Sequence, residues 1–224
     1  MIPHVHEDAG EMAIAVAKNI AVLAAKAMAE RGVFRLALAG GETPRLCYRE
    51  LARMDVDWKH VQVYFGDERC LPLNDPGRND SMARDALLKH VGIPDGNVHP
   101  IMAEFGAEAA ASRYMLVLKG IKLDLVLLGI GEDGHTASLF PGRKEIASEA
   151  SVVAVYDAPK PPAERVSLGL NTINAAREKI FIVSGEGKRC ALERILRGEM
   201  LPAARVAGAE WHVDRAALPI TERS

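Results

Sequence analysis

Hydrophobic positions along the chain repeat with two different spacings. From residue 8 to residue 31, apolar side chains recur every three or four positions, which predicts a long amphipathic helix that ends before Gly32. Shorter runs that are rich in branched side chains predict strands. The expected strands are residues 34–39, 61–65, 123–128, 152–155, 166–170 and 180–183, and the further expected helices are residues 44–53, 81–90, 107–119 and 188–196.

The alternation of strands and helices predicts the fold class. Parallel strands need long crossover connections, and the segments between the expected strands mostly have the helical spacing. We therefore expect an α/β fold with a single domain over residues 1–224, built on a mostly parallel, doubly wound (Rossmann-like) sheet with helices on both faces. Residues 211–214 are expected to form an edge strand. Ligands in such folds bind at the carboxyl ends of the strands, so the loops there are candidates for function.

Composition and charge narrow the classes of protein. Of the 224 residues, 49% are hydrophobic, which is enough for a sizeable core. The 28 Lys and Arg residues oppose 30 Asp and Glu residues, and the formal net charge of −2 provides no basic field for nucleic acid. Three cysteines are too few for a disulfide framework. We expect a cytoplasmic protein without a signal peptide, a membrane span, a nucleic-acid partner or an obligate protein partner.

The loop after the first expected strand has the features of a phosphate site. Gly40 and Gly41 allow the backbone to approach a ligand closely, and Thr43, followed by Pro44, is expected to be the N-cap of a helix. Backbone amides and the dipole at a helix N-terminus attract an anion, and the Thr43 hydroxyl adds a donor. An ordinary tight turn with a capped helix explains the same residues, so the loop alone leaves both interpretations open.

A second glycine-rich loop carries two ionisable side chains, Asp133 and His135. Residues 129–134 satisfy the GxGxxG spacing of dinucleotide-binding proteins, but Pro141 and Gly142 follow too soon for the long helix that this motif needs. We therefore expect no nicotinamide or flavin and assign no cofactor. A histidine exchanges protons near neutral pH, and a nearby carboxylate orients its ring, so the pair is a candidate for catalysis. The alternative is a structural hydrogen bond.

Charged residues also follow two other expected strands. Asp67, Glu68 and Arg69 come directly after the second strand and are candidates for substrate contact, although ordinary solvated charges explain them too. Lys188 begins a helix after a loop with two glycines, where the helix dipole disfavours a cation unless an anion is bound. The alternative is an exposed lysine. No HExxH or CxxC motif accompanies the histidines, so no metal is expected.

Five motifs together are more specific than any of these loops alone. In chain order they are ALAGGETP, VYFGDER, LVLLGIGEDGHTASLFPG, RVSLGLNTINAA and FIVSGEGKR. This combination resembles the 6-phosphogluconolactonase family, within the superfamily that it shares with glucosamine-6-phosphate isomerase. The resemblance covers nearly the whole chain, and GEDGHTASLFPG is its most specific part. It implies an enzyme that hydrolyses a phosphosugar lactone, 6-phospho-D-glucono-1,5-lactone, to 6-phospho-D-gluconate in the oxidative pentose phosphate pathway.

The resemblance also implies roles for individual residues. His135 is the general base that takes a proton from the water attacking the lactone C1, and it later returns that proton to the ring oxygen. Arg69 stabilises the tetrahedral oxyanion, and Asp133 orients or charge-balances the imidazole. Asp67 contacts sugar hydroxyls, and Glu68 is grouped with it as substrate-binding. The residues implied to hold the 6-phosphate are Gly40, Gly41, Thr43 and Lys188.

Two alternatives to lactone hydrolysis remain. The sister isomerases carry Asn-Glu-Pro after the phenylalanine of the DGH segment, and that glutamate assists ring opening, whereas here Pro141 directly follows Phe140. They also carry a tyrosine at the position of Arg69. Asp67 is nevertheless available as the carboxylate base that isomerisation needs. A non-catalytic sugar-phosphate sensor predicts a helix-turn-helix ahead of the domain and a degraded catalytic loop, and the sequence shows neither.

Overall fold

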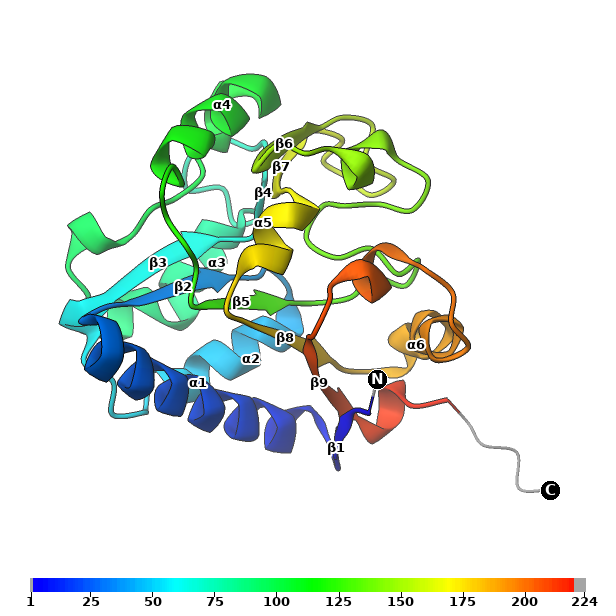
Figure 1. Ribbon diagram of the computed structural model, residues 1–224, viewed down its shortest axis with the longest axis horizontal. Helices are drawn as coiled ribbons and strands as arrows, with labels where there is room; N and C mark the ends of the chain where they lie inside the picture. The colour runs from blue at the N-terminus through cyan, green and yellow to red at the C-terminus, as the bar shows by residue number, and fades with distance from the viewer. Residues whose placement is uncertain (1, 220–224) are drawn as a thin grey trace.

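A computed structural model describes residues 2–219 and is built on a six-stranded sheet. Its strands pair in parallel in the order β1-β9-β8-β5-β2-β3 (Figure 1). The expectation of a mostly parallel sheet is therefore confirmed. The strands are β1 (His4–His6), β2 (Phe34–Leu38), β3 (Val61–Phe65), β5 (Leu125–Leu128), β8 (Glu178–Val183) and β9 (Glu210–Asp214).

Helices cover the sheet, and α1 and α2 lie together along one side of it (Figure 1). The helices are α1 (Ala9–Arg31), α2 (Glu42–Leu51), α3 (Asn79–Ala86), α4 (Ala107–Val117), α5 (Leu170–Ala175) and α6 (Arg189–Leu196). Helix α1 begins where the Asp8 side chain accepts hydrogen bonds from two backbone amides, and it ends at Gly32, which has a left-handed φ of 73°. By length and composition α1 could cross a membrane. In this fold it is a packing helix, because its apolar stripe, including Val16 and Ile20, is buried.

A second, smaller sheet was not predicted. Its strands are β4 (Asp67–Arg69), β7 (Arg165–Leu168) and β6 (Val152–Val155), and they pair antiparallel in that order. The strands expected at 152–155 and 166–170 therefore exist, but they do not belong to the parallel sheet. Residues 156–164, which connect β6 to β7, are too few for a crossover helix, so the two strands can only run antiparallel.

Two local predictions were wrong. The strand expected near residues 211–214 is not at the sheet edge, because the short strand β1 pairs outside β9 and aligns His4 with His212. The N-cap of α2 is Gly41 and not Thr43, which lies in the first turn of the helix. At Gly41 the φ of 111° is a backbone conformation that side chains disfavour, so the chain enters this helix through a glycine.

The order of the strands fixes where a ligand site can form. From β2, the chain next adds β3 on one side, and later adds β5 and β8 on the other. The carboxyl ends of β2 and β5 therefore lie side by side while their following loops lead away in opposite directions. This is the switch point at which open parallel sheets form a crevice.

Candidate active site

A cavity of about 310 Å³ lies at this switch point. The loops after β2, β3, β5 and β8 all contribute to its wall, and the connection between β6 and β7 adds residues from the smaller sheet. Among the lining residues are four cations, Arg69, Lys160, Arg165 and Lys188, but a single carboxylate, that of Asp67. The cavity therefore suits an anionic ligand.

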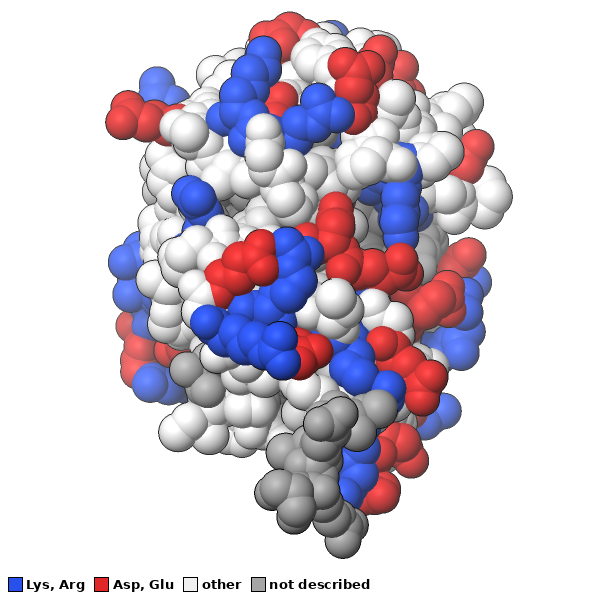
Figure 2. All heavy atoms as spheres, turned by 90° about the vertical axis from the view of Figure 1, so that its right-hand side faces the viewer, with Lys and Arg blue, Asp and Glu red and all other residues white. Residues whose placement is uncertain are grey.

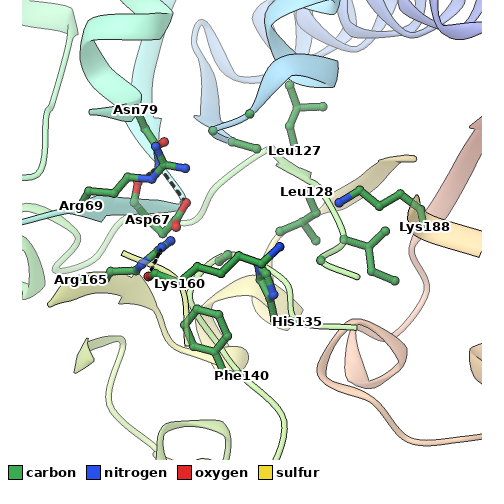
Figure 3. A pocket seen from close by; sticks show the side chains of 18 of the residues that line it. Asp67, Arg69, Asn79, Leu127, Leu128, His135, Phe140, Lys160, Arg165 and Lys188 are labelled. Atoms are coloured by element: carbon green, nitrogen blue, oxygen red, sulfur yellow. Dashed lines mark hydrogen bonds between the residues drawn. The ribbon is translucent and has the colours of Figure 1, made fainter. Parts of the chain in front are cut away.

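His135 and Asp133 form a hydrogen-bonded pair at the cavity. His135 Nδ1 lies 2.5 Å from Asp133 Oδ1, and the same oxygen accepts the backbone N–H of His135 at 3.1 Å. The imidazole also packs against the ring of Phe140, with 4.6 Å between the ring centroids. His135 lines the cavity (Figure 3), whereas the partly exposed Asp133 is not among the lining residues and is bonded to the imidazole at Nδ1.

The charge of Asp133 decides which nitrogen of His135 is basic. Burial opposes ionisation of Asp133, but the hydrogen bond and charge of the His135 ring, together with backbone amides, outweigh it and lower the pKa to about 2. Asp133 is therefore a carboxylate near neutral pH and accepts the proton of Nδ1. In neutral His135 the lone pair is then on Nε2, which is the nitrogen left to exchange a proton with a ligand.

Gly131 is what allows the imidazole to take this position. A Cβ atom at residue 131 would lie 2.0 Å from His135 Nδ1 and 2.6 Å from Asp133 Oδ1, both far inside van der Waals contact. Gly134 is constrained twice, because its φ is +87° and an added Cβ would lie 2.4 Å from a Leu201 methyl carbon. Of the glycines that match a dinucleotide motif by spacing, Gly131 thus makes room for the histidine and Gly134 for Leu201.

Asp67 lies on another wall of the cavity and is held by two neighbours. Its Oδ2 accepts the Ser138 hydroxyl at 2.7 Å, and its Oδ1 accepts the Asn79 amide at 3.1 Å. Asn79 also donates to the backbone carbonyl of Asp67 at 2.8 Å. A Cβ at Gly40 would lie 1.9 Å from Asn79 Oδ1, so the loop after β2 touches the same amide. Asp67 is thus fixed before any ligand arrives.

Arg69 is a cation that has no carboxylate partner within residues 2–219. Its guanidinium donates to the Gly77 carbonyl at 2.6 Å, while its buried Nε has no hydrogen-bond partner among the described residues. In Figure 3, Arg69, Asp67 and Asn79 lie on one side of the cavity and Lys188 lies on the opposite side, with His135 between them. A guanidinium with unused donors in a polar cavity is suited to stabilise negative charge on a ligand.

Arg165 and Lys160 line the cavity, although neither was expected from the sequence to be a site residue. Arg165 is 6% exposed. Its guanidinium donates to the carbonyls of Lys160, Pro161 and Pro162 and so stabilises the loop between β6 and β7. Burial lowers the pKa of Arg165, partly offset by the negative charge of Asp67. A charged residue directly before the expected strand at residues 166–170 was the available signal for Arg165.

Lys188 completes the group of cations. Burial lowers its pKa, the carboxylate of Glu132 opposes that effect, and the charge of Lys160 adds to it. Lys160 itself forms an exposed ion pair with Glu132 at 3.4 Å. Among the described residues, Arg69, Arg165 and Lys188 have no carboxylate within 4.0 Å, so an anionic ligand can partner all three.

Comparison with known proteins places these features in a family. The family model described as glucosamine-6-phosphate isomerases/6-phosphogluconolactonase matches residues 7–214. The chain belongs to this family. A protein named 6-phosphogluconolactonase from Mycobacterium leprae is 36% identical, with 95% of each chain covered. One of the same name from Synechocystis sp. is 38% identical over 79% of this chain and 77% of its own.

Solved structures of family members have the same fold. A 6-phosphogluconolactonase from Thermotoga maritima superposes with a TM-score of 0.89 at 28% identity, covering 96% of this chain and 99% of its own. A monomeric glucosamine-6-phosphate deaminase is similar in fold as well, with a TM-score of 0.84 at 23% identity. The architecture alone therefore does not separate the two activities, and the residues in the cavity have to.

The remaining residues singled out in the sequence lie outside the cavity. Thr43 is in the first turn of α2 and is not among the lining residues, whereas its neighbours Gly40 and Gly41 are. Glu68 is fully buried, and its carboxylate accepts backbone N–H groups behind the cavity wall. Asn79 is the converse case, since it lines the cavity but was not among the site residues expected from the sequence.

Proposed function

We propose that the protein hydrolyses 6-phospho-D-glucono-1,5-lactone to 6-phospho-D-gluconate, by attack of a water molecule that His135 activates. One observation carries the proposal: His135, whose Nε2 is the basic nitrogen, lines a cavity together with four cations and one carboxylate. The names of the curated relatives support the lactone as substrate. This is the oxidative pentose phosphate reaction that the sequence motifs imply.

The pair of His135 and Asp133 supplies the proton transfers. Nε2 takes a proton from a water molecule while the oxygen of that water bonds to the lactone C1. This step produces a tetrahedral oxyanion and an imidazolium. Ionised Asp133 stabilises that imidazolium through Nδ1–H. The C1–O bond to the ring oxygen then breaks, and Nε2 returns its proton to that oxygen. The products are a carboxylic acid and a free hydroxyl, and His135 is neutral again.

Arg69 is proposed to stabilise the oxyanion at C1. The reaction concentrates negative charge on one oxygen, and a donor aimed at that oxygen lowers the barrier. Arg69 lines the cavity and has a buried Nε–H without a partner among the described residues. Asp67, fixed by Ser138 and Asn79, is proposed to accept hydrogen bonds from the sugar hydroxyls.

The phosphate of the substrate is proposed to bind at the loop after β2 and at Lys188. The amides of Gly40 and Gly41 precede helix α2, where the dipole attracts an anion, and Lys188 adds a positive charge. Arg165 adds a buried cation to the partly buried Lys188. Thr43 keeps its proposed role as a phosphate ligand only if its hydroxyl reaches the anion when the substrate binds.

The surface charges favour a small-molecule substrate over a nucleic acid. Lys and Arg side chains alternate with Asp and Glu side chains over the face that carries α6, so the described part of that face has no continuous positive surface (Figure 2). The formal net charge of −2 likewise provides no basic field for a polyanion. The cavity differs from this mixed surface, because four cations and one carboxylate line it.

An isomerase acting on glucosamine 6-phosphate is the second candidate, because Asp67 lies in the cavity where a carboxylate base could act on a sugar carbon. Phe140 and Pro141 argue against it, since they leave no room in the sequence for the ring-opening glutamate of the sister enzymes. Arg69 also argues for the lactonase, because it supplies a cation where those enzymes have a tyrosine.

Separate assays with the two candidate substrates test the proposal. Freshly generated 6-phosphogluconolactone and glucosamine 6-phosphate are supplied separately to the protein, and acid release and ketose formation are measured against blanks without protein. Acceleration of lactone hydrolysis alone supports the proposal. Ketose formation from glucosamine 6-phosphate favours the isomerase. Binding of 6-phosphogluconate by calorimetry without either activity favours a sugar-phosphate sensor.

A further inference from the structure

The three residues of strand β4 point in alternate directions. Asp67 and Arg69 line the cavity, whereas Glu68 between them points to the opposite side, as the two-residue period of a strand requires. The Glu68 side chain is completely buried. It therefore does not reach a ligand, and the proposed reaction leaves a buried acid beside two of its residues unexplained.

The Glu68 carboxylate is bonded to the first residues of helix α3. Its Oε1 accepts the backbone N–H of Asn79 at 2.7 Å and that of Arg69 at 2.8 Å, and its Oε2 accepts the N–H of Asp80 at 2.9 Å. Asn79 and Asp80 open α3, so their amides have no partners within the helix. Glu68 thus performs from a neighbouring strand the capping that the helix lacks, since no side chain of its own N-cap does so.

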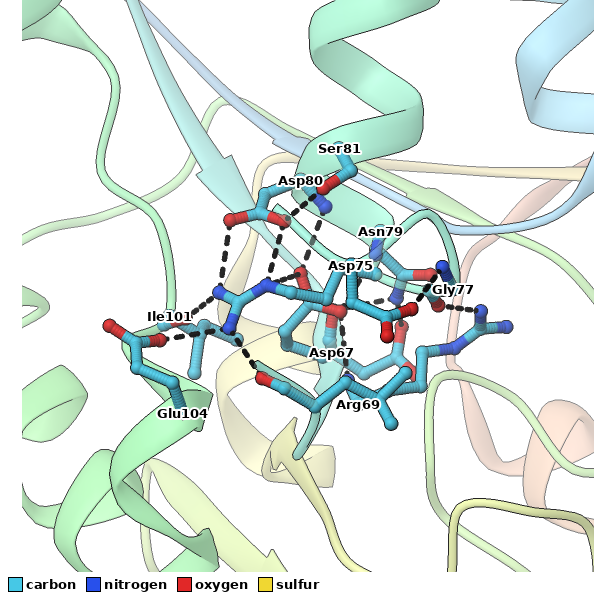
Figure 4. Close-up of polar contacts among 12 residues, drawn as sticks. Asp67, Arg69, Asp75, Gly77, Asn79, Asp80, Ser81, Ile101 and Glu104 are labelled. Carbon is cyan, nitrogen blue, oxygen red and sulfur yellow. Dashed lines mark hydrogen bonds and ion pairs between the residues drawn. The ribbon is translucent and has the colours of Figure 1, made fainter. Parts of the chain in front are cut away.

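The same helix start carries the side chain that fixes Asp67. Asn79 donates its amide to both the carbonyl and the carboxylate of Asp67, at 2.8 and 3.1 Å. Figure 4 shows Asn79 beside Asp67 at this helix start. A chain of contacts therefore leads from Glu68, through the Asn79 backbone, to the Asn79 side chain and into the cavity. Every contact in it is buried.

Arg78 supports this arrangement from the other side. Its guanidinium, 1% exposed, is bonded to both oxygens of Asp80 at 2.9 Å and to Glu104 at 2.8 Å, and its Nε lies 4.0 Å from Glu68. Burial raises the pKa of Glu68 to about 7, although the three amides lower it. Burying an ionisable acid costs folding free energy, so the position of Glu68 next to the site favours a functional role.

We propose that Glu68 is a positioning residue, which holds the start of α3 so that Asn79 fixes the Asp67 carboxylate for the sugar hydroxyls. This inference rests on the proposed function. It replaces direct substrate contact by Glu68 with an action through Asn79 and Asp67. A double-mutant cycle between Glu68→Gln and Asp67→Asn separates this role from a purely structural one, because only a residue that acts through Asp67 loses its effect when the Asp67 carboxylate is removed.

The cycle is read as the affinity for 6-phosphogluconate, measured by calorimetry well below the unfolding temperature of each variant. Glutamine keeps the size of Glu68 but has one acceptor oxygen for the three backbone N–H groups. The start of α3 therefore shifts and moves the Asn79 side chain away from Asp67. We expect Glu68→Gln to weaken binding about tenfold in the native background and less than about threefold in the Asp67→Asn background. Equal losses in both backgrounds, or no loss in the native one, would overturn the proposal.

Glu104→Gln is the matched control. Glu104 contacts the same Arg78 guanidinium but none of the three amides, so binding is expected to stay within about threefold of the native protein. A loss as large as that of Glu68→Gln would instead assign the effect to the charge balance of Arg78. If Glu68→Gln does not fold, Glu68→Asp replaces it in the same cycle, since its shorter carboxylate cannot span all three amides.

The two proposals fail in different ways. A native protein that neither binds 6-phosphogluconate nor hydrolyses the lactone refutes the proposed function. A native protein that does both, combined with an uncoupled cycle, refutes only the role of Glu68.

Discussion

Replacing Gly131 with alanine tests whether catalysis depends on the position of the His135 imidazole. The added Cβ would lie 2.0 Å from Nδ1 and 2.1 Å from Cε1 of the imidazole, whereas ordinary contact begins near 3.4 Å. The ring therefore has to move away by about 1.4 Å. It cannot do so with the Asp133 carboxylate in place, because the same Cβ would also lie only 2.6 Å from Asp133 Oδ1.

The expected cost follows from that displacement. Misplacing a reacting group by about 1 Å can lower a rate by about 10², and the Nδ1 hydrogen bond that sets the basic nitrogen is broken as well. We therefore expect kcat for lactone hydrolysis to fall at least about 100-fold. The KM should change far less, because Gly40 and Lys188, the proposed phosphate contacts, lie elsewhere in the cavity.

Steady-state hydrolysis of freshly made lactone, corrected for the spontaneous reaction, measures both constants. Gly96→Ala is the control for the substitution itself, since Gly96 has open space around its added Cβ and lies outside the cavity. Thermal unfolding of both variants shows whether the loss is global. A Gly131→Ala protein with near-native kcat would refute the claim that the imidazole position limits the rate.

Three further substitutions follow from the same geometry. Asp133→Asn is expected to lower kcat at least about tenfold, because the amide favours the His135 tautomer with its proton on Nε2. It should also remove a pH dependence of unfolding: the Asp133 pKa is lowered from 3.8 to about 2, so its contact stabilises the fold above pH 3.8 and is lost as pH falls toward 2. Lys188→Ala should raise KM about tenfold with little change in kcat, since phosphate contacts act on ground and transition states alike; a fall in kcat alone contradicts that placement. Arg69→Ala should lower kcat by about 10²–10³ in single-turnover assays, and an effect confined to KM would exclude it from the oxyanion.

The parallel sheet and the place of the site were accessible from the sequence because both follow from local patterns. Strands β3 and β6 have the bounds expected from their apolar runs. Glycines and charges directly after a strand must lie at one edge of a parallel sheet, so Asp67 and His135 could be brought together without coordinates.

What the sequence missed depends on contacts between distant segments. Arg165 enters the cavity because β7 pairs with β4 across nearly a hundred residues, and no local spacing encodes that pairing. Asn79 was not among the expected site residues, because its place in the cavity depends on hydrogen bonds to Asp67 in β4. The direction of Glu68 was the exception: if β4 had been recognised as a strand, alternation would have turned Glu68 away from Asp67 and Arg69.

Blank-corrected hydrolysis of 6-phospho-D-glucono-1,5-lactone by the native protein and by His135→Ala tests the central claim most directly. We expect a clear enzyme-dependent rate that falls at least about 100-fold in the variant, while 6-phosphogluconate still binds because the proposed phosphate contacts are intact. A variant that retains the native kcat, or a native protein that does not accelerate the reaction, would refute the proposed hydrolysis by His135.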